Sequence, residues 1–195
     1  GVSLGVSQLI EQLRHADTYG SLIRVPEGTS ALFREIARRI DVGERQQLLG
    51  GADSEEWLRG ADMCEILEDG RYTTLIANPP YLGMRKAKNP LKRFANKHYK
   101  RSSTDLCTMF IERAASLAQC RGAIGMITMH AWMFLDSYSE LRPWILSTMS
   151  IDSMAHLGTR AFDSIGGEVV QTTAFTLTNA PGTYEHIGVY FRLVD

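Results

Sequence analysis

This 195-residue sequence has few cysteines, no long apolar run and almost no net charge. Its three cysteines, Cys64, Cys107 and Cys120, form no C-x-x-C pair and leave one thiol over, so a disulfide framework is not expected. No apolar run approaches the roughly 18 residues that a membrane span needs, and the first residues lack the pattern of a signal peptide. We therefore expect reduced, buried thiols in a cytoplasmic protein with no membrane contact.

Histidine pairs with the spacing of metal ligands are missing as well. His98, His130, His156 and His186 are scattered along the chain, which argues against a zinc site. His130 follows an apolar stretch and is a candidate for facing a site, with a purely structural histidine as the alternative. We expect no metal.

The net charge of −1 hides an uneven distribution of charge. Residues 85–101 contain eight cations and no acid: Arg85, Lys86, Lys88, Lys92, Arg93, Lys97, Lys100 and Arg101. Subtracting these eight charges from the total leaves −9 for the rest of the chain. We interpret this basic loop as a contact for a polyanion, and a solvated charged surface is the alternative.

Two regions with different periodicity divide the chain. Residues 1–69 form a mainly helical segment, because apolar residues recur there at helical spacing. In its last helix we expect Trp57, Leu58 and Ile66 to be the apolar anchors. Residues 70–195 alternate strands with helices, and the strands are expected at 71–77, 123–129, 151–158, 169–179 and 188–195. This order predicts an α/β fold with a parallel sheet, completed by strands that pair antiparallel.

The helices expected between these strands cover residues 103–119 and 137–148. The first is amphipathic, with Ser103 or Thr104 as the N-cap and with Leu106, Phe110 and Leu117 on its buried side. Gly122 is expected to end it. Asp105 is a further candidate for fixing the helix start.

The strand at 71–77 ends in Asn78-Pro79-Pro80-Tyr81. Two prolines make this turn stiff and keep its carbonyls out of a helix. The Asn78 side-chain oxygen and neighbouring backbone carbonyls can together accept both hydrogens of a planar NH₂ group, and Tyr81 offers a flat face for stacking. Acceptors placed in this way favour the pyramidal, attacking form of an amine whose lone pair is otherwise delocalised.

The position of this turn favours a function. In parallel α/β sheets, ligands bind at the carboxyl ends of the strands, and the turn follows such an end. The alternative is a rigid strand-ending turn with a core tyrosine.

Several stretches resemble the N6-adenine DNA methyltransferases that use S-adenosylmethionine. "LIANPPYLG" is similar to their motif IV, and "STDLCTMFIERAASL" is similar to the helix that follows it. "GAIGMITMHAWMFLDSYSELRPWIL" and "LGTRAFDSIGGEVVQTTAFTLTN" resemble the later units, so the likeness covers about residues 70–180. The large single-chain methyltransferases of phage-resistance (BREX-type) systems resemble the chain most, and restriction-modification enzymes are close relatives.

This resemblance implies roles for individual residues. Asn78 and the Pro79 carbonyl would bind N6 of an adenine flipped out of double-stranded DNA, within the turn that Pro80 stiffens, and Tyr81 would stack on that base. Phe162 is a candidate second stacking face and Phe110 a candidate neighbour of the cofactor's adenine, with core phenylalanines as the alternative for both. The basic loop would hold DNA phosphates.

The family's Gly-rich cofactor-binding turn is not found before residue 78. The resemblance therefore implies a fragment of a larger enzyme, inactive by itself, with the later strands and helices of a partial Rossmann-like methyltransferase sheet. Its main S-adenosylmethionine site is expected in the remainder of the parent polypeptide. Other phage-defence proteins are further candidate partners. Two alternatives stay open: methylation of a protein glutamine or an RNA guanine by the same turn, and a non-catalytic DNA-binding or assembly module.

Overall fold

A computed structural model describes residues 2–41, 53–159, 171–183 and 185–194 of the chain. The chain divides into two compact units, Gly1–Arg71 and Tyr72–Asp195, each with its own apolar core. No helix within the described ranges is long and apolar enough to cross a bilayer. Phe162 lies outside the described residues.

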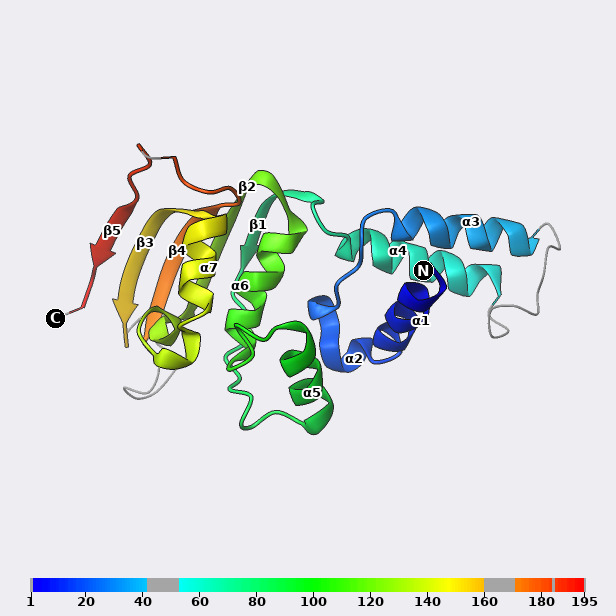
Figure 1. Cartoon of the computed structure of the whole chain (residues 1–195), viewed down its shortest axis with the longest axis horizontal. Helices are drawn as coiled ribbons and strands as arrows, with labels where there is room; N and C mark the ends of the chain where they lie inside the picture. Colours follow the sequence, from blue (N-terminus) through cyan, green and yellow to red (C-terminus); the bar gives the residue numbers. More distant parts are fainter. Residues whose placement is uncertain (1, 42–52, 160–170, 184, 195) are drawn as a thin grey trace. The chain divides into compact units, whose positions relative to one another are not determined.

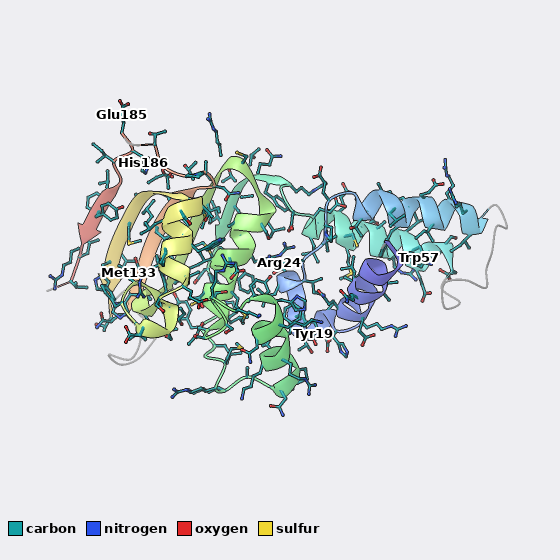
Figure 2. The ribbon with its side chains drawn as sticks, in the orientation of Figure 1. Tyr19, Arg24, Trp57, Met133, Glu185 and His186 are labelled. Carbon is teal, nitrogen blue, oxygen red and sulfur yellow. The ribbon has the colours of Figure 1, made fainter. Side chains whose placement is uncertain are left out.

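The first unit is helical. It contains α1 (Val2–Leu13), α2 (Ala16–Tyr19), the 3-10 turn η1 (Gly20–Leu22), α3 (Thr29–Asp41) and α4 (Ser54–Leu67). Trp57, labelled in Figure 2, packs edge-to-face on Phe33 with ring centroids 4.9 Å apart. These two rings lie in the core of the unit.

Two of the three side chains expected to be buried as apolar anchors of α4 are exposed, so this prediction is wrong for them. Leu58 is 40% exposed and Ile66 is 61% exposed. The helix instead buries Trp57, Ala61 and Cys64, which recur at spacings of four and three residues and so share one face of the helix.

The second unit contains a five-stranded sheet (Figure 1). Its strands are β1 (Tyr72–Ala77), β2 (Ala118–Met129), β3 (Ser150–Gly158), β4 (Thr172–Thr178) and β5 (Val189–Arg192), in the spatial order β1-β2-β4-β3-β5. β1 is parallel to β2, and β3 is parallel to β5. β4 runs antiparallel between β2 and β3. The predicted α/β fold is confirmed, and β4 pairs antiparallel as expected. The expectation is wrong for the last strand, because β5 pairs parallel with β3.

Helices α6 (Leu106–Leu117) and α7 (Leu141–Thr148) lie on one face of this sheet (Figure 1). The core between helices and sheet includes Ile111, Ile124, Leu141, Ile145 and Phe175. β1 and β2 are parallel, so the chain must cross over between them, and α6 forms that crossover.

The start and the buried side of α6 differ from the expectation. Asp105 is the N-cap, and its side chain accepts a hydrogen bond from the Cys107 amide. The most buried apolar side chains are Cys107, Met109, Ile111 and Ala114, because α6 packs on the sheet and also against the segment that precedes it. Leu106, Phe110 and Leu117 are only half-buried.

Gly122 does not end this helix. α6 ends at Leu117, and β2 starts at Ala118 with an irregularity in its pairing to β1 before Ala123. Gly122 lies within that irregular stretch.

The basic loop is not a loop throughout. Residues Asn89–His98 form a helix, α5, with Pro90 in its first turn. The helix buries Leu91, Phe94 and Ala95. Phe94 and Ala95 follow Leu91 by three and four residues, so the three side chains share one face, which explains why a strongly basic segment folds as a helix.

The strand directions bring four carboxyl ends to one edge of the sheet. β1, β2, β3 and β5 all run the same way, since β4 is antiparallel to both of its neighbours and β5 is parallel to β3. Asn78 follows β1, the 3-10 turn η2 (His130–Met133) follows β2, and Gly158 ends β3. We call this edge the carboxyl edge.

Candidate active site

The Asn78–Tyr81 segment begins where β1 ends at the carboxyl edge. The expected turn is not formed there, because residues 78–82 have neither a turn nor a bend; we keep the name Asn78–Tyr81 turn for this segment. Asn78 and Pro80 are exposed, whereas Pro79 is buried and Tyr81 is half-buried. Asn78 and Ile76 also line an open groove of about 420 Å³ that crosses the sheet face opposite α6 and α7. An exposed amide between a strand and a buried proline is thus held at a fixed place, available to a ligand.

Tyr81 lies close to Asp105 and Cys107 at the start of α6. Its hydroxyl oxygen is buried and has no hydrogen-bond partner among the described residues. Burial raises the pKa of Tyr81, and the nearby Cys107 and Asp105 raise it further. The phenol is therefore neutral, and its ring is held beside the N-terminus of α6.

Asp105 connects the turn to α6. It is 3% exposed, its Oδ1 accepts the Cys107 amide hydrogen at 2.9 Å, and its backbone pairs with Gly83 in an isolated antiparallel bridge. On either side of that bridge, the Met84 amide donates to the Thr104 carbonyl at 2.9 Å and the Leu106 amide to the Leu82 carbonyl at 3.0 Å. The chain just after Tyr81 is therefore held against the α6 N-cap.

Buried polar side chains extend this support. The Thr108 hydroxyl donates to the carbonyls of Ser102 and Asp105, both at 2.8 Å. The Ser102 hydroxyl donates to Glu112, whose carboxylate is almost fully buried, at 2.8 Å. Paired groups of this kind fix one arrangement, because breaking any of the bonds would leave a buried polar atom without a partner.

The eight predicted phosphate contacts fall into two groups. Arg101 lies over the Trp144 ring at 4.8 Å and 3.9 Å from Glu112, and Lys92 donates to the Arg85 carbonyl at 3.0 Å. The other six side chains are exposed: Arg85, Lys86, Lys88, Arg93, Lys97 and Lys100. Arg93 and Lys97 share one face of α5, since they are four residues apart.

The other candidates lie elsewhere. Phe110 packs against the core of the second unit. Phe162 is not among the described residues, so the structure does not place it. Within the described ranges, no cluster of three or more histidine, cysteine or acidic side chains could hold a metal ion.

Two histidines that the sequence pattern does not link are in contact at the carboxyl edge. His130 Nδ1 lies 3.0 Å from His156 Nε2, although the two residues are 26 positions apart. His130 directly follows β2, and His156 lies near the end of β3. Their positions at the carboxyl ends of two strands that run the same way are the sequence feature that could have predicted the contact. Met133, labelled in Figure 2, lies in the same η2 turn as His130.

Comparison with known families identifies the chain. Residues 18–162 match the model of the Eco57I restriction-modification methylase family. The chain belongs to this family. The matched range contains the Asn78–Tyr81 segment, the basic segment and the whole of α6.

Two curated relatives of this Eco57I-family chain are named adenine-specific methyltransferases. BrxX from Escherichia coli O9:H4 (strain HS) is 39% identical over 186 residues, covering 92% of this chain and 15% of that protein. PglX from Lacticaseibacillus casei (strain Zhang) is 48% identical over 165 residues, covering 84% of this chain and 14% of that protein. The chain thus spans about one seventh of the length of these relatives.

A solved structure of the Type IIL restriction-modification enzyme MmeI in complex with DNA is also similar. The similarity has a TM-score of 0.47 and 18% identity, and covers 59% of this chain and 17% of the other.

Proposed function

We propose that this chain is part of the catalytic domain of an adenine-specific DNA methyltransferase, which transfers a methyl group from S-adenosylmethionine to N6 of a flipped adenine. The observation that carries the proposal is the Asn78–Tyr81 turn: an exposed amide follows β1, a buried proline comes next, and a tyrosine is anchored on the α6 N-cap. Membership of the Eco57I family and the names of the two relatives support it.

In this proposal, the turn both binds and activates the acceptor amine. The Asn78 side-chain oxygen and the Pro79 carbonyl accept the two N6 hydrogens and hold them away from the plane of the base. The amine lone pair then loses conjugation with the ring and becomes nucleophilic. Tyr81 stacks on the flipped base, and burial of its hydroxyl group keeps the ring in place.

The methyl donor supplies a methyl group on a positively charged sulfur when it is bound. The described residues around Asn78 do not form a complete cradle for it, since Asn78 and Pro80 are exposed and Phe110 packs into the core. We propose that the residues that bind most of the donor lie elsewhere in the complete protein.

The exposed cations of residues 85–100 contact the DNA backbone in this proposal. Six of the eight side chains in the basic segment are exposed, while Arg101 and Lys92 have partners inside the protein. Cations of this kind bind phosphates without reading sequence. They also favour a nucleic acid over a protein glutamine as the acceptor.

The test uses the complete reading frame that contains this chain, expressed with its genomic neighbours. N6-methyladenine in the host DNA is mapped by single-molecule sequencing for wild type, Asn78→Ala and Asn96→Ala. Asn96 is an exposed asparagine of α5 and provides the matched control. We expect methylation at a defined site in wild type and Asn96→Ala, and a loss of roughly 100-fold or more in Asn78→Ala, as for other preorganised hydrogen bonds.

Equal methylation by wild type and Asn78→Ala would remove Asn78 from the mechanism. Soluble wild-type protein that leaves DNA unmethylated would contradict the choice of DNA adenine as acceptor.

A further inference from the structure

A polar cavity lies at the carboxyl end of β3, apart from the Asn78–Tyr81 turn. It measures about 370 Å³, and the residues with polar side chains among those that line it are His156, Thr159, Gln171 and Arg192. β5 runs parallel to β3 and places Arg192 opposite His156 in the strand register. None of the described residues that line the cavity is acidic. A guanidinium, an imidazole, an amide and a hydroxyl make a lining rich in hydrogen-bond donors.

His156 is held in this cavity by a second histidine. His130 Nδ1 lies 3.0 Å from His156 Nε2, and the two rings stack with centroids 5.0 Å apart. Phe134 packs edge-on against the His130 ring at 5.3 Å, and the His130 amide donates to the Gln171 carbonyl at 2.9 Å. The imidazole pair is therefore positioned by three different segments.

The hydrogen bond inside the pair determines what its outer nitrogens can do. One of the two nitrogens in contact carries the shared proton, which leaves His130 Nε2 and His156 Nδ1 as the outer atoms. In the neutral pair one outer nitrogen donates and the other accepts, whereas a pair with one more proton donates from both. An oxyanion would stabilise the second form.

The charges around the pair agree with an anion as the ligand. Burial lowers the pKa of His130, and the neighbouring His156 lowers it further, with no carboxylate contributing. Arg192 also lines the cavity and carries a positive charge. A bound anion would pair with this guanidinium and would favour the protonated form of the histidine pair.

The cavity also lies at the same edge of the sheet as Asn78, within reach of a strand bound there. It is at the carboxyl edge, like Asn78, and three strand spacings separate β1 from β3 in the sheet. At roughly 4.8 Å for each spacing this amounts to about 14 Å, a distance that a few nucleotides of a strand cover.

We propose that the His156–Arg192 cavity binds a backbone phosphodiester of the nucleic acid whose base enters the Asn78–Tyr81 turn. This inference rests on the proposed function. The cavity then has a positioning role. A phosphate bound there holds the DNA strand on one side of the flipped nucleotide, and the basic segment holds it on the other side.

The first experiment measures binding of a labelled duplex of mixed sequence to the complete gene product at several potassium chloride concentrations. Arg192→Gln is compared with Arg121→Gln, which removes the same charge from an exposed position at the opposite edge of the sheet. We expect Arg192→Gln to weaken binding and to reduce the slope of log affinity against log salt by about 0.9, the loss of one phosphate contact. Arg121→Gln should leave the slope unchanged.

The second experiment compares wild type with His156→Gln between about pH 8 and about pH 6, the range in which histidine takes up a proton. A glutamine amide can keep the contact with His130 Nδ1 but removes the ring proton and the outer nitrogen. We expect wild-type affinity for the duplex to rise more steeply as the pH falls than that of His156→Gln. Histidine proton signals in NMR spectra report separately whether the duplex or added inorganic phosphate occupies the cavity.

The outcomes separate the two proposals. Duplex binding with equal salt slopes for Arg192→Gln and Arg121→Gln overturns the cavity's role and leaves the proposed function intact. Histidine signals that respond to inorganic phosphate and not to the duplex also overturn it. Wild-type protein without any affinity for the duplex overturns both proposals.

Discussion

At the scale of single residues, the site depends on contrasts between neighbours. Asn78 is exposed while Pro79 is buried, and the Tyr81 ring is accessible in part while its hydroxyl is not. The prolines explain the first contrast, because they stiffen the backbone without using its carbonyls. Packing against Asp105 and Cys107 explains the second.

Replacing Tyr81 by phenylalanine should not destabilise the chain. The hydroxyl is buried without a partner among the described residues, so its removal costs no hydrogen bond and relieves a desolvation penalty. We expect the free energy of unfolding in urea to stay equal or rise by up to about 1 kcal/mol. Methylation by the complete protein should persist in Tyr81→Phe and fall in Tyr81→Ala, which loses the stacking face. A Tyr81→Phe variant less stable than wild type would indicate a hydrogen bond to that hydroxyl.

The three thiols should differ sharply in reactivity. Cys64 and Cys107 are buried and Cys120 is exposed, so the expectation of buried thiols is wrong for Cys120. Burial, together with Glu68, raises the pKa of Cys64 to about 11, and burial with Asp105 raises the pKa of Cys107. The thiolate is the reactive form, so a maleimide counted by mass spectrometry should label the native chain once. Cys120→Ser should remain unlabelled until denaturant is added, and rapid double labelling of the native wild type would contradict this burial.

At the scale of elements, helix starts support the site. Asp105 caps α6 and Asp53 caps α4 through the same kind of bond, from the Cys107 amide at 2.9 Å and from the Glu56 amide at 2.8 Å. The two caps differ in surroundings, since Asp105 is buried beside the chain that follows Tyr81 and Asp53 is exposed. They therefore form a matched pair for separating helix stability from site geometry.

Asp105→Ala and Asp53→Ala should each cost about 1 kcal/mol of local stability, the usual value of an N-cap. Hydrogen exchange should accelerate in the first turn of α6 for the first variant and of α4 for the second. Only Asp105→Ala should also reduce methylation by the complete protein, because it releases the segment that holds Tyr81. Equal methylation activity of the two variants would show that Asp105 acts only as a helix N-cap and does not support the site.

At the scale of the whole molecule, the two units have separate cores. The core of the first contains Phe33 and Trp57, and the core of the second contains Trp132 and Phe175. Within each pair the rings are in edge-to-face contact, at 4.9 Å and 5.5 Å between centroids. Separate cores predict separate responses to a core cavity.

Phe33→Ala and Phe175→Ala test this independence in the 195-residue chain. Each removes a buried aromatic ring and should cost about 3–5 kcal/mol in its own unit. Hydrogen exchange followed by mass spectrometry should show faster exchange of α3 and α4 in the first variant and of β2 and β4 in the second. Faster exchange of both units in either variant would show that they unfold together.

Features that depend on local chemistry could be predicted from the sequence. The helices and most strands follow from apolar spacing, because this effect acts within a few residues. The two prolines after β1 end the strand, although no turn is formed at residues 78–81. The order of elements then predicted the α/β sheet and the edge at which the candidate site lies.

Only the tertiary structure decided which surfaces meet. The buried side of α6 depends on the segment packed against it, and the folding of residues 89–98 into α5 depends on the core that receives Phe94. The contact of His130 with His156 requires β4 to insert between β2 and β3, a pairing that no local pattern encodes. Long-range register brings these groups together, and register is a property of the packed sheet.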